Sequence, residues 1–484
     1  MPTNDILWLL KNYIILALKI LTPILVIFFT VYFLLYKKIL KGTKTIKKSK
    51  IFLYSISLCY IVIVIGATFL GRTPSNLDNV KMNLNLFSSY FEAYHDIGVV
   101  LLNNVLLRNL VLNIMLFIPL GFLLPMCSDK LKKIYIVVLI GFFITLVIEF
   151  TQHFQGYGVF EIDDVLNNTI GTLLGYCVFM FFYKLKSKEN LKKIIVYILP
   201  VFTIIGVFAG MLIGYKKQEF GNFDFENNYT IDMNNVNVQS EIEFSNDRSR
   251  MQVYKTEIIT RDKARDIAMN VFNKKGKLID DNVNRESENL VVFKPLRKDM
   301  SDEDASVVVY YIGGKYSYSD SSYITIEKDG SVESISKMDD ASEEEVRLAL
   351  LNLGINVPEN AEFVRDKRRD QYLFSMNMDK QGNKLINGEI RCNYYSDSSI
   401  KYFENNIVTY YMVAEKEIIS QQEAFQKILR GKFKAFTIEE IKSILIKDIT
   451  LEYKTDSKGY YVPVYKFDIL LNGKKNNIYI KAID

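Results

Sequence analysis

The sequence predicts a polytopic α-helical membrane domain of about six helices, followed by an extracytoplasmic α+β domain of helix-plus-antiparallel-meander units. Two observations predict this fold class. The first 215 or so of the 484 residues are far more apolar than the rest and contain long apolar runs. The rest combines capped helices with alternating strands and hairpin turns. We expect a membrane domain over 1–215, a linker over 216–255, and an α+β domain of two or three repeated modules over 256–484.

Six apolar stretches are long enough, or nearly so, to cross a membrane. A helix needs about 20 mostly apolar residues to span a hydrocarbon core of roughly 30 Å. The first stretch is too long for a cleaved signal peptide, and no small-x-small site follows it. The six run over Ile20–Tyr36, Ile51–Leu70, Asn109–Met126, Ile134–Phe150, Asn168–Tyr183 and Ile194–Gly214, and the shorter ones are expected to extend into flanking residues.

The lysines predict how these helices are oriented. Lysine is enriched in loops on the cytoplasmic side of a membrane. The loop Lys37–Lys50 holds seven lysines, and the loops after the third and fifth stretches hold three and five more. We therefore expect these three loops in the cytoplasm. An even number of spans then places the N-terminus and everything after Gly214 outside.

Composition excludes several classes of function. A net charge of +5 is small for this length and argues against nucleic acid as a partner. Only one of the four cysteines, Cys392, lies in the polar half, so we expect no disulfide framework. There are two histidines and no Cys/His cluster with zinc spacing, so we expect neither a metal nor a cofactor. Membrane lipids are the first expected partners.

Polar residues recur near one end of three predicted spans. Ionisable groups at membrane depth are costly and usually functional. Glu149 and Gln152 share a helix face with His153, while Asp164 and Asn168 share a stripe with two glycines. The topology places these groups, with Asn113, at the outer interface. The predicted ligand-binding residues are Arg72, Asn83, Asn113, Glu149, Gln152, Asp163, Asp164 and Asn168.

A structural interpretation of the same residues stays open. Polar residues cap helix ends, and Asp163 and Asp164 at the start of a helix suit its dipole. Gly171 and Gly175 form a small-xxx-small pair, which is typical of close helix packing. We expect structural roles for Pro119, Gly121, Gly171 and Gly175.

These residues also carry a resemblance to a known family. The segment Asn109–Pro125, NLVLNIMLFIPLGFLLP, resembles the first signature of the VanZ-like membrane family. Glu149-Phe-Thr-Gln152 resembles that family's E-x-x-Q. The run from Phe160 to Gly175 resembles its F-D-I-D-D-x-x-x-N-x-x-G-x-x-x-G. Asn83-Leu-Asn-Leu-Phe87 resembles its N-L-x-P-F, and the order and spacing match over about 71–185.

Two departures from the family pattern concern the acidic run. The family often has an arginine shortly before its aspartates, whereas residues 155–159 read QGYGV, and the first acid is Glu161. The resemblance implies a bacterial cell-envelope membrane protein. Since the family is named for resistance to the glycopeptide teicoplanin, it also implies antibiotic resistance, and a lipid-linked wall precursor or a glycopeptide as ligand.

The polar half predicts helices and hairpins. Helices are expected after Thr260, after the capping boxes that begin at Ser342 and Ser420, and after Thr437. Hairpin turns are expected at Asp329-Gly330, Asn387-Gly388 and Asn472-Gly473. The pattern of a helix and a meander, best in 419–484, resembles PepSY-type or YycI-type extracytoplasmic modules. No G-x-S-x-G motif, no glycine-rich phosphate loop and no histidine follow His153.

Three hypotheses for function remain. The first is a non-catalytic protein that binds a lipid or wall-derived headgroup at the outer leaflet. The second is an outer-leaflet enzyme in which Glu149, Asp163 or Asp164 acts as general base or metal ligand. The third is an envelope sensor or regulator that acts through its outer domain and another membrane protein. We favour the first, so we do not expect an enzyme.

Overall fold

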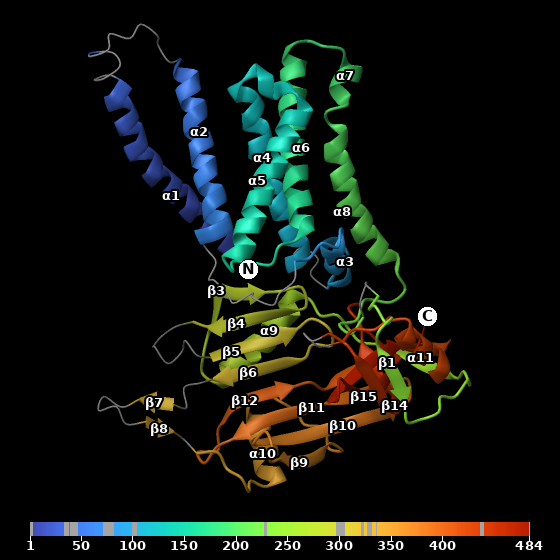
Figure 1. Cartoon of the computed structure of the whole chain (residues 1–484). Helices are drawn as coiled ribbons and strands as arrows, with labels where there is room; N and C mark the ends of the chain where they lie inside the picture. The colour runs from blue at the N-terminus through green and yellow to red at the C-terminus, as the bar shows by residue number, and fades with distance from the viewer. Residues whose placement is uncertain are drawn as a thin grey trace. The chain divides into compact units, whose positions relative to one another are not determined.

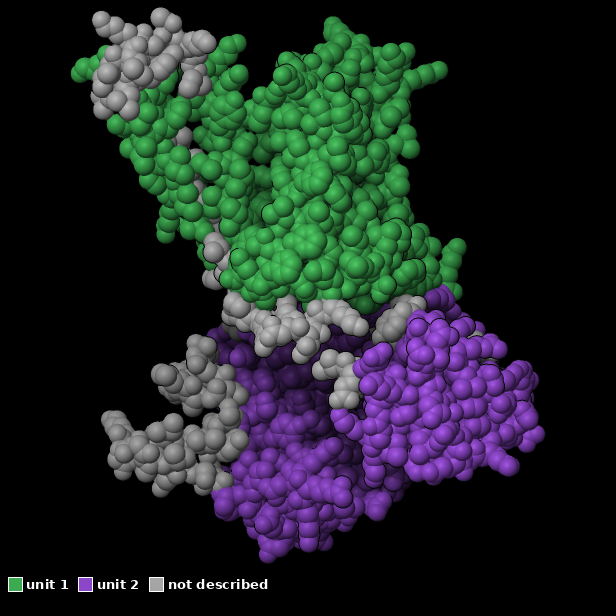
Figure 2. All heavy atoms as spheres, in the orientation of Figure 1, with its two compact units in different colours: residues 1–94, 105–217 green, residues 95–104, 218–484 purple. Residues whose placement is uncertain are grey.

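The computed structural model describes most of the chain, in two compact units. It covers residues 3–32, 38, 47–70, 82–98, 104–226, 230–296, 305–320, 324–326, 332–334, 336–435 and 440–483. Unit 1 comprises residues 1–94 and 105–217, and unit 2 comprises residues 95–104 and 218–484 (Figure 2). The segment 95–104 is therefore assigned to unit 2, although the residues on both sides of it in sequence belong to unit 1.

Unit 1 is helical (Figure 1). Within the described residues, five helical segments are long and apolar enough to cross a membrane, and Ile14–Thr30 is a shorter apolar helix. The chain is therefore a multi-pass membrane protein. The helices are α1 (Thr3–Thr30), α2 (Lys48–Ile65) with the π-turn η2 (Gly66–Leu70), α3 (Ser88–His95), α4 (Val105–Cys127), η4 (Asp129–Lys132), α5 (Ile134–Phe154), α6 (Ile162–Lys186), α7 (Leu191–Ile195) and α8 (Leu199–Lys217).

Two of the six predicted spans differ from the structure. α1 begins at Thr3 rather than near Ile20, because isolated lysines such as Lys11 and Lys19 do not interrupt a run of good helix formers. The last part of that predicted span, residues 33–36, lies outside the described residues. The sixth span is split by turns at 196–198, and α8 starts just before Pro200, which is tolerated in a first helical turn. The middle four spans extend by several residues, as expected.

Unit 2 repeats one local pattern three times in its described residues: a helix and then antiparallel strands. α9 (Arg261–Lys274) precedes β3 (Ile279–Glu286), β4 (Leu290–Pro295), β5 (Ala305–Tyr310) and β6 (Tyr316–Asp320). α10 (Glu343–Asn352) precedes β9 (Glu362–Asp366), β10 (Gln371–Gln381), β11 (Lys384–Tyr394) and β12 (Ile400–Asn405). α11 (Gln421–Leu429) precedes β14 (Ser443–Thr455), β15 (Tyr460–Leu471) and β16 (Lys474–Lys481). This confirms the predicted fold class.

One sheet joins these strands. Its hydrogen-bonded order is β1-β14-β15-β2-β13-β11-β12-β6-β5-β4-β3, with β10 and β9 beyond β11, and β16 beside β15. β13 is Val408–Glu417, and the short strands β7 (Ile324–Ile326) and β8 (Val332–Ser334) pair separately. β1 (Asn237–Ser240) and β2 (Arg250–Lys255) belong to the sheet, although they lie in the stretch 216–255 predicted as a linker. Their polar composition gave no strand signal, although Val253 and Tyr254 of β2 are both buried, on opposite faces of the sheet.

Local signals mark the helix starts and one hairpin. Thr260 caps α9, and Ser342 and Ser420 form capping boxes at α10 and α11. Asn472 and Gly473, with φ of 50° and 80°, make the predicted turn between β15 and β16. Thr437 and Asp329-Gly330 lie outside the described residues, but residues 440–442 are not helical and β14 begins at Ser443.

The second predicted hairpin, Asn387-Gly388, is wrong. Both residues lie inside β11, and the chain turns instead between Gln381 and Lys384. Gly388 has a φ of 127°, and a methyl group there would overlap the carbonyl oxygen of Asn406. The glycine is therefore required by a close approach of two backbones within the sheet rather than by a turn.

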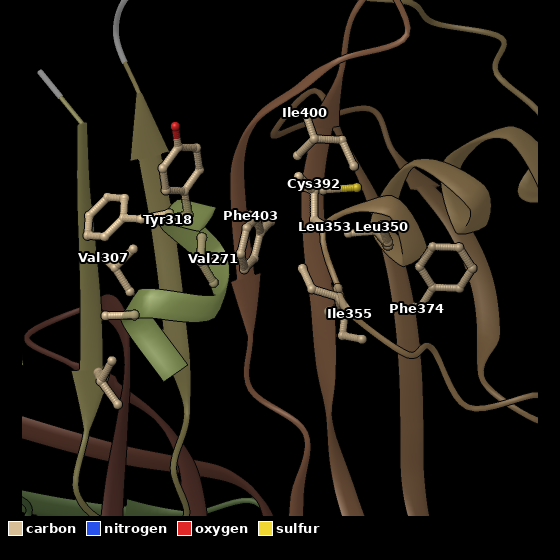
Figure 3. Packing of buried hydrophobic residues seen from close by; sticks show 14 of the residues in the cluster. Val271, Val307, Tyr318, Leu350, Leu353, Ile355, Phe374, Cys392, Ile400 and Phe403 are labelled. Atoms are coloured by element: carbon tan, nitrogen blue, oxygen red, sulfur yellow. The ribbon is translucent and has the colours of Figure 1, made fainter. Parts of the chain in front are cut away.

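Two large apolar clusters form the core of unit 2. One lies under α9 and α10 and includes Val271, Leu350 and Phe374 together with Cys392 and Phe403 (Figure 3). The other lies under α11. Between them, Tyr410 stacks on Tyr461 with ring centroids 4.2 Å apart. Because these tyrosines pack against one another, they are part of the sheet's own packing.

Candidate polar site in the membrane helices

The site is built on an antiparallel register between α5 and α6. A methyl group at Gly141 would overlap the side chain of Thr172. One turn further along α5, Thr145 accepts a hydrogen bond of 2.7 Å from Asn168 Nδ2. Each step of four residues forward on α5 is thus a step of four back on α6. The next step places Glu149 level with Asp164, about 6 Å along the helices from the Thr145–Asn168 pair.

We call Asn113, Glu149, Asp164 and Asn168, which lie at this level or one helical turn from it, the polar layer. Its α5 side is buried. Glu149 is 5% exposed and Gln152 is 4% exposed. Gln152 donates a hydrogen bond of 2.8 Å to the backbone carbonyl of Thr68, in the π-turn that ends α2. A π-turn leaves backbone carbonyls without regular helical partners, so the amide both satisfies Thr68 and fixes the end of α2 against α5.

The α4 side is held by Asn113. Its Nδ2 donates a hydrogen bond of 2.6 Å to Asp164 Oδ1. The structure thus brings together Asn113, Glu149, Asp164 and Asn168 from three helices, all of which the sequence predicted as ligand-binding residues. Arg72, the predicted cation of this set, lies outside the described residues.

Asp163 accepts hydrogen bonds from backbone N–H groups through its side chain, and Asn83 forms hydrogen bonds through its own backbone. Asp163 is fully buried, and its two oxygens accept hydrogen bonds from the backbone N–H groups of Phe87 and Ser89, at 2.6 and 2.8 Å. These amides belong to the start of α3, where the dipole favours a negative charge. Asn83 exchanges backbone hydrogen bonds with Phe160 and Ile162. In this arrangement both residues hold the segment before α3 against α6.

Two buried amide atoms of α6 lack hydrogen-bond partners among the described residues. They are Oδ1 of Asn168 and Nδ2 of Asn167. Asn167 accepts a hydrogen bond from the Tyr90 hydroxyl, and the sequence analysis missed it. Asn167 lies one turn after Asp163, on the side of α6 that meets α3, and no sequence pattern indicates that side. A buried polar atom without a hydrogen-bond partner costs about 1–3 kcal/mol of stability. A water or a ligand bound at each of these two atoms would remove that cost.

The glycines of this region allow α4 and α6 to touch. A methyl group at Gly171 or Gly175 would overlap the carbonyl oxygens of Ile114 and Ile118, and one at Gly121 would overlap that of Thr172. Pro119 lies within α4 and is exposed. Since proline has no N–H, it leaves the carbonyl four residues earlier, at Met115, without its helical donor.

The acidic side chains of this region bear on metal binding. In the described part of the chain, no three His, Cys, Asp or Glu side chains converge as a metal site would require. Glu149 and Asp164 supply two carboxylates to the layer. Both oxygens of the third acid, Asp163, accept hydrogen bonds from backbone amides. The layer offers hydrogen-bonding and acidic groups, of which Glu149 and Asn168 are buried and Asn113 and Asp164 are half-buried.

Comparisons with known proteins bear on both units. No curated protein matches the chain. Among solved structures, the Bacillus megaterium YpeB C-terminal domain matches with 12% identity, covering 47% of this chain and 94% of that chain at a TM-score of 0.15. At so low a TM-score the match supports no conclusion about this chain. The family model VanZ/LLP1 matches residues 51–183. The segment from α2 to α6 therefore has the VanZ-like resemblance that its motifs predicted.

Proposed function

We propose that the chain binds a lipid or wall-derived headgroup at the layer formed by Asn113, Glu149, Asp164 and Asn168, and thereby lowers susceptibility to glycopeptides such as teicoplanin. One observation carries the proposal. Within the bundle, three helices bring buried or half-buried polar side chains to within about one helical turn of one another, and Asn168 keeps an acceptor oxygen that no described residue satisfies. Polar groups at membrane depth are expensive and usually serve function.

The orientation of the chain is part of the same proposal. The lysine-rich loops favour a cytoplasmic position for residues 37–50, 130–133 and 184–193. Unit 2 and the polar layer then lie on the outer side, where wall precursors and glycopeptides meet. Labelling of single cysteines with a membrane-impermeant maleimide tests this: a cysteine at the exposed Ser398 should react in whole cells, and one at Ser187 should react only after lysis.

The test of function compares glycopeptide susceptibility in a bacterial host that expresses wild type or variants at equal membrane levels. Wild type should raise tolerance to teicoplanin more than to vancomycin. Glu149→Gln and Asp164→Asn should abolish that gain, because each removes a carboxylate while keeping its shape. Glu189→Gln is the matched control, since Glu189 pairs with Lys184 away from the layer. A wild type without effect, or a control that fails equally, contradicts the proposal.

An enzyme acting on a lipid-linked substrate is the second candidate. The α5–α6 register favours it by placing Glu149 level with Asp164, as a general base and its acidic neighbour would need. The two candidates differ in product. Purified protein in lipid nanodiscs, incubated with lipid-linked wall precursor, should return the precursor unchanged if it only binds. Release of a modified precursor by wild type, but not by Glu149→Gln, would establish the enzyme.

A further inference from the structure

One edge of β14 is open along most of its length. On the other edge, β15 pairs with β14 from Ile444 to Thr455. On the open side, β1 covers only Ser443–Ile446, in parallel, and no other described strand pairs with β14. Residues 447–455 therefore present backbone N–H and C=O groups that have no strand partner in the described part of the chain. An edge of this kind is a template on which another strand can pair.

Side chains of this edge also lack complementary partners. Leu451 is 37% exposed, whereas the apolar residues two positions before and after it, Ile449 and Tyr453, are partly buried. Asp448 is exposed, and its carboxylate accepts a hydrogen bond of 2.8 Å from the N–H of Ile449. It forms no ion pair with a described residue, and the residue opposite it on β15 is another acid, Asp468. The edge thus offers an uncovered apolar side chain beside a carboxylate that no described cation neutralises.

A second copy of β14 matches this edge in one antiparallel register. Residues that face each other across two strands lie on the same face of the sheet, so a two-fold axis between identical strands must lie level with a residue. With the axis at Leu451, apolar residues face apolar residues and an acid faces a base. The facing pairs are Leu451 with Leu451, Ile449 with Tyr453, and Asp448 with Lys454. Cross-strand pairs of these kinds stabilise an antiparallel ladder.

The neighbouring registers are less favourable. With the axis at Thr450, Asp448 would face Glu452, and with the axis at Glu452 that residue would face its own copy. Like charges directly opposite each other destabilise a sheet. The end of the strand agrees with the axis at 451: Thr455, the last residue of β14, falls opposite Lys447, directly after the residues that β1 covers. The second strand would therefore fill the open edge without displacing β1.

We propose that two copies of this chain pair through the open edges of β14, antiparallel about a two-fold axis at Leu451. The contact is isologous, so it contains two ion pairs between Asp448 and Lys454. Lys454 Nζ lies 4.6 Å from the centroid of the Tyr479 ring and pairs with no carboxylate among the described residues, so it is free to meet Asp448 of the second copy. The interface lies within unit 2 and does not depend on the polar layer in unit 1.

The first test measures the mass of the full-length protein in detergent by light scattering over a range of concentrations. Wild type should be a dimer at micromolar concentration. Asp448→Lys and Lys454→Asp should each raise the dissociation constant of the dimer at least tenfold, because each brings like charges together. The double exchange of the two charges should restore the dimer. Glu359→Lys is the matched control, since Glu359 is an exposed acid in the turn before β9 and should leave the dimer unchanged.

A second test uses a disulfide to locate the contact. Leu451→Cys should form a crosslinked dimer that wild type, with its four native cysteines, does not form, because residues that face each other on antiparallel strands have Cα atoms about 4.5–5.5 Å apart. Lys447→Cys should not crosslink. Its two copies would lie eight residues apart along the ladder, or about 26 Å.

Three outcomes would overturn this proposal. A wild type that stays monomeric at every concentration would mean that the edge charges keep β14 unpaired. A dimer that Asp448→Lys leaves intact, or that the double exchange fails to restore, would place the interface elsewhere. A cysteine at 451 that crosslinks in cells to a different protein, and not to a second copy, would make the edge a site for another partner.

Discussion

α6 and α8 carry the same pattern of glycines in very different surroundings. Methyl groups at Gly171 and Gly175 on α6 would overlap carbonyl oxygens of α4, whereas at Gly206 and Gly210 on α8 a methyl group would meet nothing within 4 Å. Within their most apolar windows, 56% of α6 is buried and 6% of α8. Small residues four apart permit close packing. Close packing at such glycines also requires a neighbouring helix. α6 has α4 against its two glycines, whereas α8 has no described atom within 4 Å of a methyl group at Gly206 or Gly210.

Gly175→Ala should have the largest effect. The added methyl group has no room beside the Ile118 carbonyl, and a backbone cannot move aside as a flexible side chain can. Overpacking of this kind costs typically 1–3 kcal/mol, and we expect about 3 kcal/mol here. Unfolding in mixed detergent, followed by circular dichroism, measures the change. Gly206→Ala on α8 is the control and should not destabilise. Equal losses at both sites would remove the distinction between the helices.

Asp163→Asn should have the next largest effect, and it separates two neighbouring acids of α6. Asp163 accepts backbone N–H bonds from Phe87 and Ser89, so an amide in its place turns one acceptor into a donor that faces a donor. We expect a loss of about 2 kcal/mol. Asp164→Asn keeps Oδ1 as the acceptor for Asn113 and should lose less than half of that.

Thermal unfolding of the two variants in nanodiscs is the measurement for this pair of acids. The two effects should also separate by assay: Asp163→Asn lowers stability, and Asp164→Asn lowers glycopeptide tolerance at normal stability. If Asp164→Asn proved the less stable variant, the assignment of structural and functional roles would be reversed.

The sequence predicted where helices and strands occur better than it predicted which residues they contact. The middle spans follow from apolar length, and α9, α10 and α11 follow from Thr260, Ser342 and Ser420, because caps are local chemistry. Asn387-Gly388 failed because the same dipeptide suits a turn and a close backbone approach. The choice depends on Asn406, eighteen residues away.

The polar layer shows the same limit. Helical periodicity placed Glu149, Asp164 and Asn168 on stripes, but it gave no rotation of one helix relative to another. Asp163 joined the predicted site only as the neighbour of Asp164 in the acidic run, although successive residues on a helix point about 100° apart. Asn167 was overlooked for the same reason, since its side faces Tyr90 of α3, and no sequence pattern links those two residues.

Thr145→Val should have a smaller effect on stability. It extends the comparison of α6 with α8 from glycines to hydrogen bonds. Thr145 Oγ1 joins α5 to α6, whereas Thr203 on α8 bonds only to the Leu199 carbonyl of its own helix. A hydrogen bond between membrane helices contributes about 1 kcal/mol. We expect that loss for Thr145→Val and almost none for Thr203→Val, in the same detergent unfolding assay. A loss at Thr203 that matched the one at Thr145 would show that α8 has a packing partner of its own.

Gly210→Ala should have the smallest effect, and in the opposite direction. Glycine inside a helix is less stable than alanine by roughly 0.5–1 kcal/mol, because its backbone loses more freedom on folding. At Gly210 the methyl group meets no neighbour, so α8 should gain stability of up to about that amount. The same unfolding assay, run at low protein concentration in detergent, measures the gain. A loss of stability instead would mean that a surface packs against Gly210 in solution, and that α8 uses its glycines as α6 does.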